Sequence, residues 1–399
     1  MLLSTVKMAL LLFLIALLIS VSVFPIVYLY SQNESEVPID EFYFGVSHGS
    51  NSTMEAKLMI DEVKDYANLF VLASWDISIN ETALNEVCNY AVDAGMSVIV
   101  YFDFLPFQTY PWLPTWLETT KERWGDQFLG IYLHDEPGGN QIDSNQWQPG
   151  RSARLAMENA SDYSDAANRF VTSIPNSYSW QELKSLNVDL PIVTSDYALY
   201  WFDYLAGYDT IFVELGWNAS TTQQIGLCRG AANVQGKDWG AIVTWTYSQP
   251  PYIAGELELY HEMVTAYSAG AKYVIVFNFP KNPEDNPYGI LDEDHLEAMR
   301  LFWEYTQTFP RETYGQVDGE VALVLPKDYG WGTRRTENVI EDRIWGFWPE
   351  DENIVLIGTN MKELMFRYGL KLDIIYDDPQ FNYREKYSKI YFWNETLPF

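Results

Sequence analysis

Cysteine and histidine are scarce in this chain, with only two cysteines and four histidines among 399 residues. Cys88 and Cys228 lie in segments that we predict to be helices far apart in the chain order. A disulfide requires Cα atoms within about 7 Å, so we expect two free thiols. Neither residue type occurs at the spacing of a metal site. The sequence therefore predicts no metal and no cofactor.

Basic residues are also few, because 25 Lys and Arg stand against 55 Asp and Glu, which gives a formal net charge of −30. A chain of this charge repels phosphate backbones, which argues against nucleic-acid binding. The simplest interpretation of the acidity is a well-solvated surface. Hydrophobic residues make up 48% of the chain and aromatic residues 16%, so a large core is expected.

A long run without charge stands near the N-terminus, from Met8 to Tyr30. A membrane-spanning helix needs about 20 apolar residues, whereas a signal peptide has an apolar core of about 7–15 residues and a small-residue cleavage site. The run ends in bulky aromatic residues, which favours an uncleaved transmembrane anchor over residues 8–30. Lys7 before the run and acidic residues after it predict a single-pass cell-membrane protein whose bulk is extracellular. Six Asn-x-Ser/Thr sequons would then be glycosylation sites: Asn33, Asn51, Asn80, Asn159, Asn218 and Asn394.

From residue 42 onward, short apolar runs alternate with longer amphipathic segments. This alternation predicts a parallel sheet covered by helices. The strand candidates are Phe42–His48, Leu69–Ser74, Ser97–Asp103, Phe128–Glu136, Pro191–Asp196, Thr210–Glu214, Gly240–Tyr247 and Lys272–Phe279. Helix candidates include Thr53–Ala67, Glu81–Ala94, Thr115–Trp124, Thr221–Val234, Glu256–Ala269 and Asp292–Gln307.

Eight such units fit a (β/α)8 TIM barrel over residues 40–313. The alternative is an open doubly wound sheet, which usually carries G-x-G-x-x-G after its first strand. The segment Gly45–Ser50 lacks that motif. After a linker, residues 319–399 predict a small α/β domain of the flavodoxin or amidotransferase type. Its predicted elements are strands at Glu320–Leu325, Lys371–Tyr376 and Lys389–Trp393, and a helix at Asn360–Tyr368.

Catalytic groups of such barrels lie at the carboxyl ends of the strands. Those ends are polar and aromatic here, which suits a sugar site, because sugar faces pack on rings and sugar hydroxyls bind charged groups. The predicted substrate-binding residues are His48, Trp75, Asp103, His134, Asp135, Asp196, Trp201, Trp217, Trp245, Tyr247 and Asn278. The alternative is structural: the aromatic residues fill the core, the histidines are packed polar residues, and the aspartates only position others.

Glu136 at the end of the fourth strand is the first predicted catalytic residue. Strand alternation places Tyr132, His134 and Glu136 on one face, which would point Glu136 into the barrel mouth. A carboxyl in such an apolar setting has a raised pKa and can act as a general acid. The alternative is a loop carboxylate that caps the next helix.

The run Asp135-Glu136-Pro137 resembles the Asn-Glu-Pro signature of the cellulase and β-galactosidase clan of barrel glycosidases. The resemblance implies that Glu136 is the acid/base and that Asp135 stands where the clan has an Asn that contacts the sugar 2-hydroxyl. Val321–Tyr329 and Leu370–Pro379 resemble the amidotransferase-like domain appended to some of these barrels. The clan also has a nucleophilic Glu at the end of strand 7, where this sequence has no acidic residue.

Glu214 at the end of the sixth strand is the best substitute for that nucleophile. It lies in an apolar run, where an unpaired carboxylate would be costly. Its alternative is an ion pair with a barrel Arg or Lys. The sequence thus predicts a glycoside hydrolase acting on extracellular or cell-surface glycan. The alternative function is a non-catalytic carbohydrate-binding or surface scaffold protein on a degenerate barrel.

Overall fold

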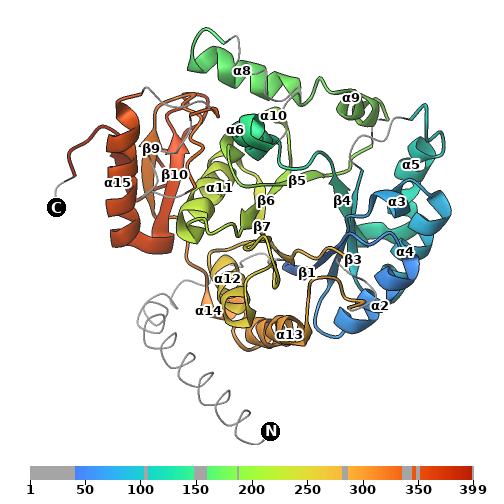
Figure 1. The fold of residues 1–399 in the computed structure, drawn as a ribbon. Coiled ribbons are helices and arrows are strands. Elements are labelled where there is room, and N and C mark those ends of the chain that lie inside the picture. Colours follow the sequence, from blue (N-terminus) through green and yellow to red (C-terminus); the bar gives the residue numbers. More distant parts are fainter. Residues whose placement is uncertain are drawn as a thin grey trace, which may run out of the picture.

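The computed structural model describes residues 41–102, 107–147, 160–186, 188–280, 286–334, 344–346 and 351–397. Within them, eight parallel strands close into a barrel in chain order, with β8 paired to β1 (Figure 1). The strands are β1 Tyr43–His48, β2 Leu69–Leu72, β3 Ser97–Tyr101, β4 Phe128–Tyr132, β5 Ile192–Asp196, β6 Thr210–Leu215, β7 Asp238–Val243 and β8 Tyr273–Val276. The predicted (β/α)8 barrel is therefore confirmed.

Helices surround the barrel and cover the outer faces of its strands (Figure 1). They are α2 Thr53–Val63, α3 Trp75–Ser78, α4 Glu81–Asp93, α5 Leu113–Trp124, α6 Pro137–Trp147, α8 Tyr163–Ser173, α9 Tyr178–Ser185, α10 Tyr200–Ala206, α11 Thr221–Gln235, α12 Glu256–Ser268, α13 Glu293–Thr308 and α14 Arg311–Tyr314. Two 3-10 turns, Gly125–Gln127 and Gly369–Lys371, lead into strands. Side chains cap several helices; Asn80, for example, accepts the Thr82 and Ala83 N–H groups at the start of α4.

The barrel has an inner and an outer layer of apolar side chains. Alternate strand residues fill the interior: Leu69, Val71, Ile99, Tyr132, Val193, Phe212, Ile242, Tyr273 and Ile275. Their neighbours along the strands pack outward against the helices. Because the side-chain period of a strand is two, Ser195 and Glu214 follow Val193 and Phe212 on the inner face. These two residues therefore point into the mouth at the carboxyl end of the barrel.

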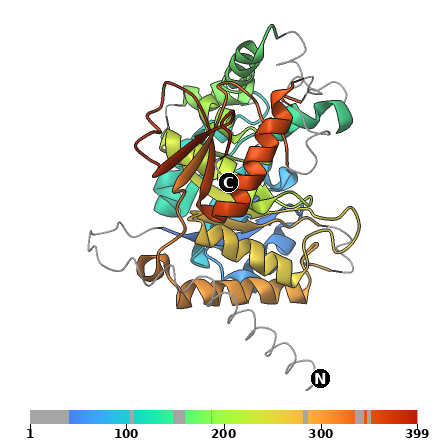
Figure 2. The same ribbon diagram turned by 90° about the vertical axis from the view of Figure 1, so that its left-hand side faces the viewer.

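A second, three-stranded parallel sheet has the order β10-β9-β11, with β9 Val321–Leu325, β10 Leu372–Tyr376 and β11 Lys389–Phe392. It lies between α15 (Asn353–Tyr368) and the barrel helix α11 (Figures 1 and 2). Glycines in α11 permit the close approach: a Cβ on Gly230 would lie 2.9 Å from the Ile374 carbonyl oxygen. The domain boundary at residue 319 and the amidotransferase-like relationship stay predictions.

No helix in the part of the chain that the structure describes is long and apolar enough to cross a membrane. The longest of these helices, α13 and α15, have 16 residues each, and a spanning helix needs about 20 apolar residues. This finding corrects the transmembrane helix in the predicted fold class and the predicted single-pass localisation, since none of the described helices could serve as the membrane anchor. The predicted anchor over residues 8–30 lies outside the described residues.

The sequons are placed only in part. Asn51, Asn80, Asn218 and Asn394 are exposed, and Asn33 and Asn159 lie outside the described residues. Exposure alone does not show modification, so glycosylation stays a prediction.

Candidate active site

Three neighbouring strands bring carboxyl groups to one end of the barrel. Glu136 follows β4, Asp196 is the last residue of β5 and Glu214 lies near the end of β6. Because β5 pairs in parallel with both β4 and β6, the carboxyl ends of all three strands open on the same side. Asp196 and Glu214 are buried and Glu136 is half-buried. The two predicted catalytic residues therefore meet at one site.

The backbone at Glu136 is unusual. β4 ends at Tyr132, and both His134 (φ 60°) and Glu136 (φ 49°) adopt the left-handed conformation. Residues other than glycine rarely adopt this conformation, and it concentrates at functional sites. The Glu136 N–H donates to the Ser195 carbonyl oxygen at 3.2 Å, which anchors the turn to β5. The strand alternation predicted to continue through Glu136 therefore stops four residues earlier.

Asp196 caps the helix that follows Glu136. Its carboxylate accepts the N–H groups of Gly138 at 2.5 Å and Gly139 at 2.7 Å, in the first turn of α6. It also accepts the N–H groups of Tyr197 and Ala198. Burial raises the pKa of Asp196 to about 7, although these four hydrogen bonds oppose that rise. The capping role that was the alternative for Glu136 thus belongs to Asp196.

Glu214 ends a short chain of hydrogen-bonding groups. Ser195 Oγ lies 2.7 Å from Glu214 Oε1 and 2.7 Å from the Tyr132 hydroxyl. The Tyr132 hydroxyl in turn donates to Asp135 Oδ1 at 2.6 Å. The chain therefore runs from the buried Glu214 carboxyl to the exposed Asp135 carboxylate.

The direction of this chain depends on the protonation of Glu214. When Glu214 is ionised, Ser195 Oγ donates to it. When Glu214 is protonated, it can donate to Ser195 Oγ, whose own hydrogen then faces the Tyr132 hydroxyl. Glu214 is buried and Asp135 is exposed, so burial favours the protonated form of Glu214.

The electrostatics agree with this assignment. Burial, with repulsion from Asp135 as the next cause, raises the pKa of Glu214 to about 8. Burial also raises the pKa of Glu136 well above its usual range, and repulsion from Glu214 adds to the effect. Two carboxyls that repel each other in this way titrate as a pair. One of the two can therefore stay protonated while the other is ionised.

Aromatic side chains line the same end of the barrel. Trp75, Trp217 and Tyr247, which follow β2, β6 and β7, are 43%, 44% and 45% exposed. Trp245 is half-buried and contacts Phe277, with the ring centroids 5.3 Å apart. The Trp217 N–H donates to the Trp245 carbonyl oxygen at 2.6 Å, so the loops after β6 and β7 are joined. These predicted substrate-binding residues are available to a ligand.

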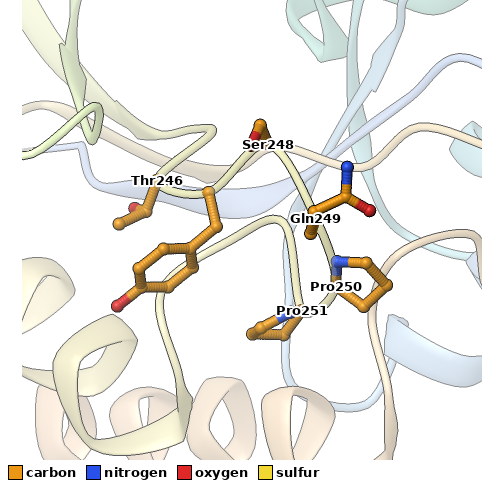
Figure 3. A pocket seen from close by; sticks show the side chains of 6 residues that line it. Thr246, Ser248, Gln249, Pro250 and Pro251 are labelled. Atoms are coloured by element: carbon orange, nitrogen blue, oxygen red, sulfur yellow. The ribbon is translucent and has the colours of Figure 1, made fainter.

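A hollow of about 460 Å3 lies beside Tyr247. Thr246, Tyr247, Ser248, Gln249, Pro250 and Pro251 line it, all from the loop between β7 and α12 (Figure 3). A bridge between Trp245 and Ile253 closes this loop at its base. The hollow therefore offers an aromatic ring, hydroxyls and an amide at the barrel mouth.

Other predicted site residues lie elsewhere. His48 is buried on the outer face of β1 beside Phe70, and burial lowers its pKa to about 4. His134 turns outward, where its Nδ1 lies 3.0 Å from the Tyr208 hydroxyl. Trp201 is buried against Tyr376 of β10. All three therefore occupy the packed structural positions that were their alternatives.

The remaining predicted residues have mixed outcomes. Asn278 is buried, and its Oδ1 accepts the Ile290 N–H at 3.1 Å, so it anchors the loop after β8. Asp135 is exposed beside the pair and bonded to Tyr132. Asp103 lies outside the described residues.

The sequence prediction missed several groups. Tyr132 and Ser195 lie on the inner face of their strands, and continuing the alternation along β5 would have found Ser195. Asp203 in α10 is fully buried, and burial together with repulsion from Asp196 raises its pKa. Arg334 comes from the segment after β9, and no local sequence signal connects it with the barrel mouth.

No group of three or more His, Cys, Asp or Glu side chains that could hold a metal ion occurs among the described residues. No family model matches the chain, and no curated protein matches it. Solved structures are similar to parts of the chain. An alpha-L-fucosidase (isoenzyme 2) from Paenibacillus thiaminolyticus is similar over 88% of this chain and 59% of its own, at 12% identity and a TM-score of 0.49.

Two further solved structures are similar to the chain at lower TM-scores. A GH99 endo-alpha-mannosidase from Bacteroides thetaiotaomicron is similar over 66% of this chain and 81% of its own, at 10% identity and a TM-score of 0.38. A truncated 3-deoxy-D-arabino-heptulosonate 7-phosphate synthase from Thermotoga maritima is similar over 72% of this chain and 93% of its own, at 11% identity and a TM-score of 0.37. The present chain spans 59% of the fucosidase chain. Likeness at this level concerns the fold and carries no inference about activity.

Proposed function

We propose that this chain is a glycoside hydrolase in which Glu136 is the general acid and Glu214 is the nucleophile or the base. The observation that carries the proposal is a pair of carboxyls that repel each other, the half-buried Glu136 after β4 and the buried Glu214 near the end of β6. Glycosidic cleavage needs two carboxyl groups with different proton affinities. The pair meets that need once Glu214 has lost its proton and Glu136 has kept one.

The reaction follows from that protonation state. Glu136 donates its proton to the glycosidic oxygen as the bond to the sugar C1 breaks. The Glu214 carboxylate then either bonds to C1, or takes a proton from a water molecule that attacks C1. In the first route, water then attacks C1, its proton passes to the Glu136 carboxylate, and the bond between C1 and Glu214 breaks. In the second route, Glu214 gives up the proton that it took from water, and Glu136 takes one back, directly or through solvent. Both routes restore the starting state. Neither route requires a metal or an organic cofactor.

Carbohydrate is the substrate class that the surroundings favour. Trp75, Trp217 and Tyr247 present exposed ring faces around the mouth, and sugar C–H faces pack on such rings. The hollow beside Tyr247 adds hydroxyl and amide groups that can bind sugar hydroxyls.

A non-catalytic carbohydrate-binding role is the second candidate. Its support is the end of β7, where Thr244 and Trp245 replace an acidic residue. With the pKa of Glu214 at about 8, the pair also lacks an ionised carboxylate at neutral pH. This candidate predicts saturable sugar binding without turnover at any pH.

The test uses the full chain against a panel of aryl glycosides and oligosaccharides from pH 5 to 10. We expect Glu136→Gln and Glu214→Gln each to lower kcat by about 10²–10⁴-fold, the range for loss of a general acid or base. The matched control is Glu262→Gln. Glu262 is a different carboxyl whose pKa burial raises to about 7, and its side chain accepts from Thr221 on α11.

The control should keep full activity. Turnover that survives in Glu136→Gln would remove Glu136 from the mechanism. Sugar binding by the wild type and by all three variants, without any turnover, would instead establish the binding role.

A further inference from the structure

We propose that Arg334, from the segment after β9, is a positioning residue of the barrel site. It holds α6, the helix that begins directly after Glu136, and its positive charge favours the ionised form of the Glu136 carboxyl. The inference rests on the proposed function, because it assigns Glu136 as the acid. It concerns a residue almost two hundred positions further along the chain.

Arg334 is held by groups from the loops that follow β4 and β5. Its guanidinium forms an ion pair with Asp143 on α6, the helix that begins directly after Glu136. The guanidinium carbon lies 3.9 Å from the centroid of the Tyr197 ring, in the loop after β5. The Tyr197 hydroxyl donates to Asp143 Oδ2 at 3.0 Å, which closes a triangle of three side chains. Stacking and pairing of this kind fix the direction of a guanidinium.

The backbone around Arg334 reaches the third loop. The Ser220 N–H donates to the Arg334 carbonyl oxygen at 3.0 Å, in the loop that follows β6 and Glu214. Gln223 Nε2 donates to the neighbouring Thr333 carbonyl oxygen at 2.5 Å. One short segment therefore contacts the loops after β4, β5 and β6, which are the strands that carry the buried carboxyls.

Residues 344–346 support α6 at a second point. Gln141 Nε2 donates to the Trp345 carbonyl oxygen at 3.1 Å. The Tyr197 ring packs so closely on α6 that a Cβ on Gly139 would lie 2.1 Å from its Cζ atom. Because α6 begins at Pro137, these contacts determine where Glu136 is held.

The charge of Arg334 acts on Glu136 directly. Although burial opposes it, attraction from Tyr197, Asp143 and Glu136 raises the pKa of Arg334. By reciprocity, the guanidinium favours the ionised form of Glu136, against the repulsion from Glu214, Asp135 and Asp196. Asp143, paired with Arg334, partly cancels this effect, and the guanidinium also acts electrostatically on the Tyr200 hydroxyl.

Two substitutions should therefore move the Glu136 carboxyl in opposite directions. Arg334→Gln removes a positive charge, so Glu136 should lose its proton at a higher pH, by roughly one unit. Asp143→Asn removes a negative charge, so the loss should occur at a lower pH. Arg334→Lys keeps the charge and should leave the midpoint within a few tenths of a unit while lowering kcat.

The measurement is an infrared titration of the protonated carboxyl band from pH 5 to 10 on the full chain, with the Glu136 band assigned by its loss in Glu136→Gln. Unmoved midpoints in both Arg334→Gln and Asp143→Asn, or shifts of the same sign, would overturn the proposal. Kinetics give a second readout: we expect Arg334→Gln to lower kcat at least tenfold with little change in KM. A rise in KM alone would make Arg334 a substrate-binding group instead.

The titration needs no turnover. If the wild-type chain hydrolyses nothing, the proposed function fails while the shifts still decide whether Arg334 acts on Glu136.

Discussion

Asp196 holds the first turn of α6 through the N–H groups of Gly138 and Gly139, and Glu136 stands one residue before that helix. The two carboxyls therefore have different roles at the carboxyl end of the barrel. Asp196 supplies the cap, and the Glu136 side chain is left to face Glu214. An acid at the N-terminus of a helix would ordinarily be read as the cap itself.

This division can be tested with Asp196→Asn. The variant keeps one acceptor but turns an amide group toward backbone donors, so we expect a loss of about 1–3 kcal/mol in the free energy of unfolding. Because Glu136 is displaced with the turn, kcat should also fall at least tenfold.

The matched control is Asn80→Ala, which removes the cap of α4. It should cost about 1 kcal/mol by urea denaturation and leave kcat unchanged. Equal kcat values in the two variants would show that the Asp196 cap does not position Glu136.

The hydrogen bond from Ser195 Oγ should set the acidic limb of the pH profile. This bond lowers the pKa of Glu214, which burial raises to about 8. Glu214 must be ionised to act, so kcat/KM should rise with pH through that value. Ser195→Ala removes the donor, and the limb should move to higher pH.

Ser47→Ala is the comparison, since Ser47 Oγ accepts from the Asn278 N–H on the opposite side of the barrel. Its limb should coincide with that of the wild type. If Ser195→Ala left the acidic limb of the kcat/KM profile at the same pH, that limb would belong to a group other than Glu214.

His48 should make the fold sensitive to acid. Burial lowers its pKa from 6.5 to about 4, and neither ring nitrogen has a hydrogen-bond partner among the residues that the structure describes. A lowered pKa stabilises the fold above pH 6.5, and that contribution is lost as pH falls toward 4. Its size is about 3 kcal/mol, since one pKa unit corresponds to about 1.4 kcal/mol.

His48→Leu should therefore lose less stability than the wild type between pH 6.5 and 4. At neutral pH the change should be small, because the apolar side chain leaves no buried group unsatisfied. Urea denaturation at both pH values measures the difference. Parallel losses in the two proteins would contradict the assignment.

The pair of Arg229 on α11 and Asp373 on β10 should be essential for attachment of the second sheet. Their side chains are 3% and 0% exposed, with Nε and Oδ1 2.8 Å apart. Removing one partner of a buried pair typically costs about 3–5 kcal/mol, because the other charge is left unpaired. We expect that loss for Asp373→Asn.

The control is Asp238→Asn at an exposed pair with Lys272, where the two side chains are 51% and 28% exposed. Exposed pairs contribute at most about 1 kcal/mol. If Asp373→Asn and Asp238→Asn lowered the free energy of unfolding in urea by the same amount, the buried Arg229–Asp373 pair would contribute no more to stability than an exposed pair.

Much of the fold follows from periodicity alone. All eight barrel strands and the three strands of the second sheet lie where apolar runs predict them. Strands such as β2, β9 and β10 are buried on both faces, and a strand in that position is apolar nearly throughout. The carboxyl ends were placed less well. The fourth strand was predicted to reach Glu136 but ends at Tyr132, since left-handed residues follow it.

The candidate site was predictable where one strand decided the geometry. Glu214 continues the inner face of β6 from Phe212, so the period of two predicts its direction. His48 and His134 were harder, because a strand-end histidine reads alike whether it faces inward or outward. The role of Arg334 could not be predicted from the sequence, because its position depends on how a distant segment packs and no spacing along the chain indicates that contact.

The packing of Trp345 on Phe202, with ring centroids 4.5 Å apart, ties the barrel to residues made after it. A ribosome completes β8 before it makes the segment from Tyr329 to Gly346. The nascent barrel therefore holds all of its carboxyls while the outer support of α6 is still missing. On this account α6 gains its contacts with Arg334 and Trp345 only after the whole barrel has been made.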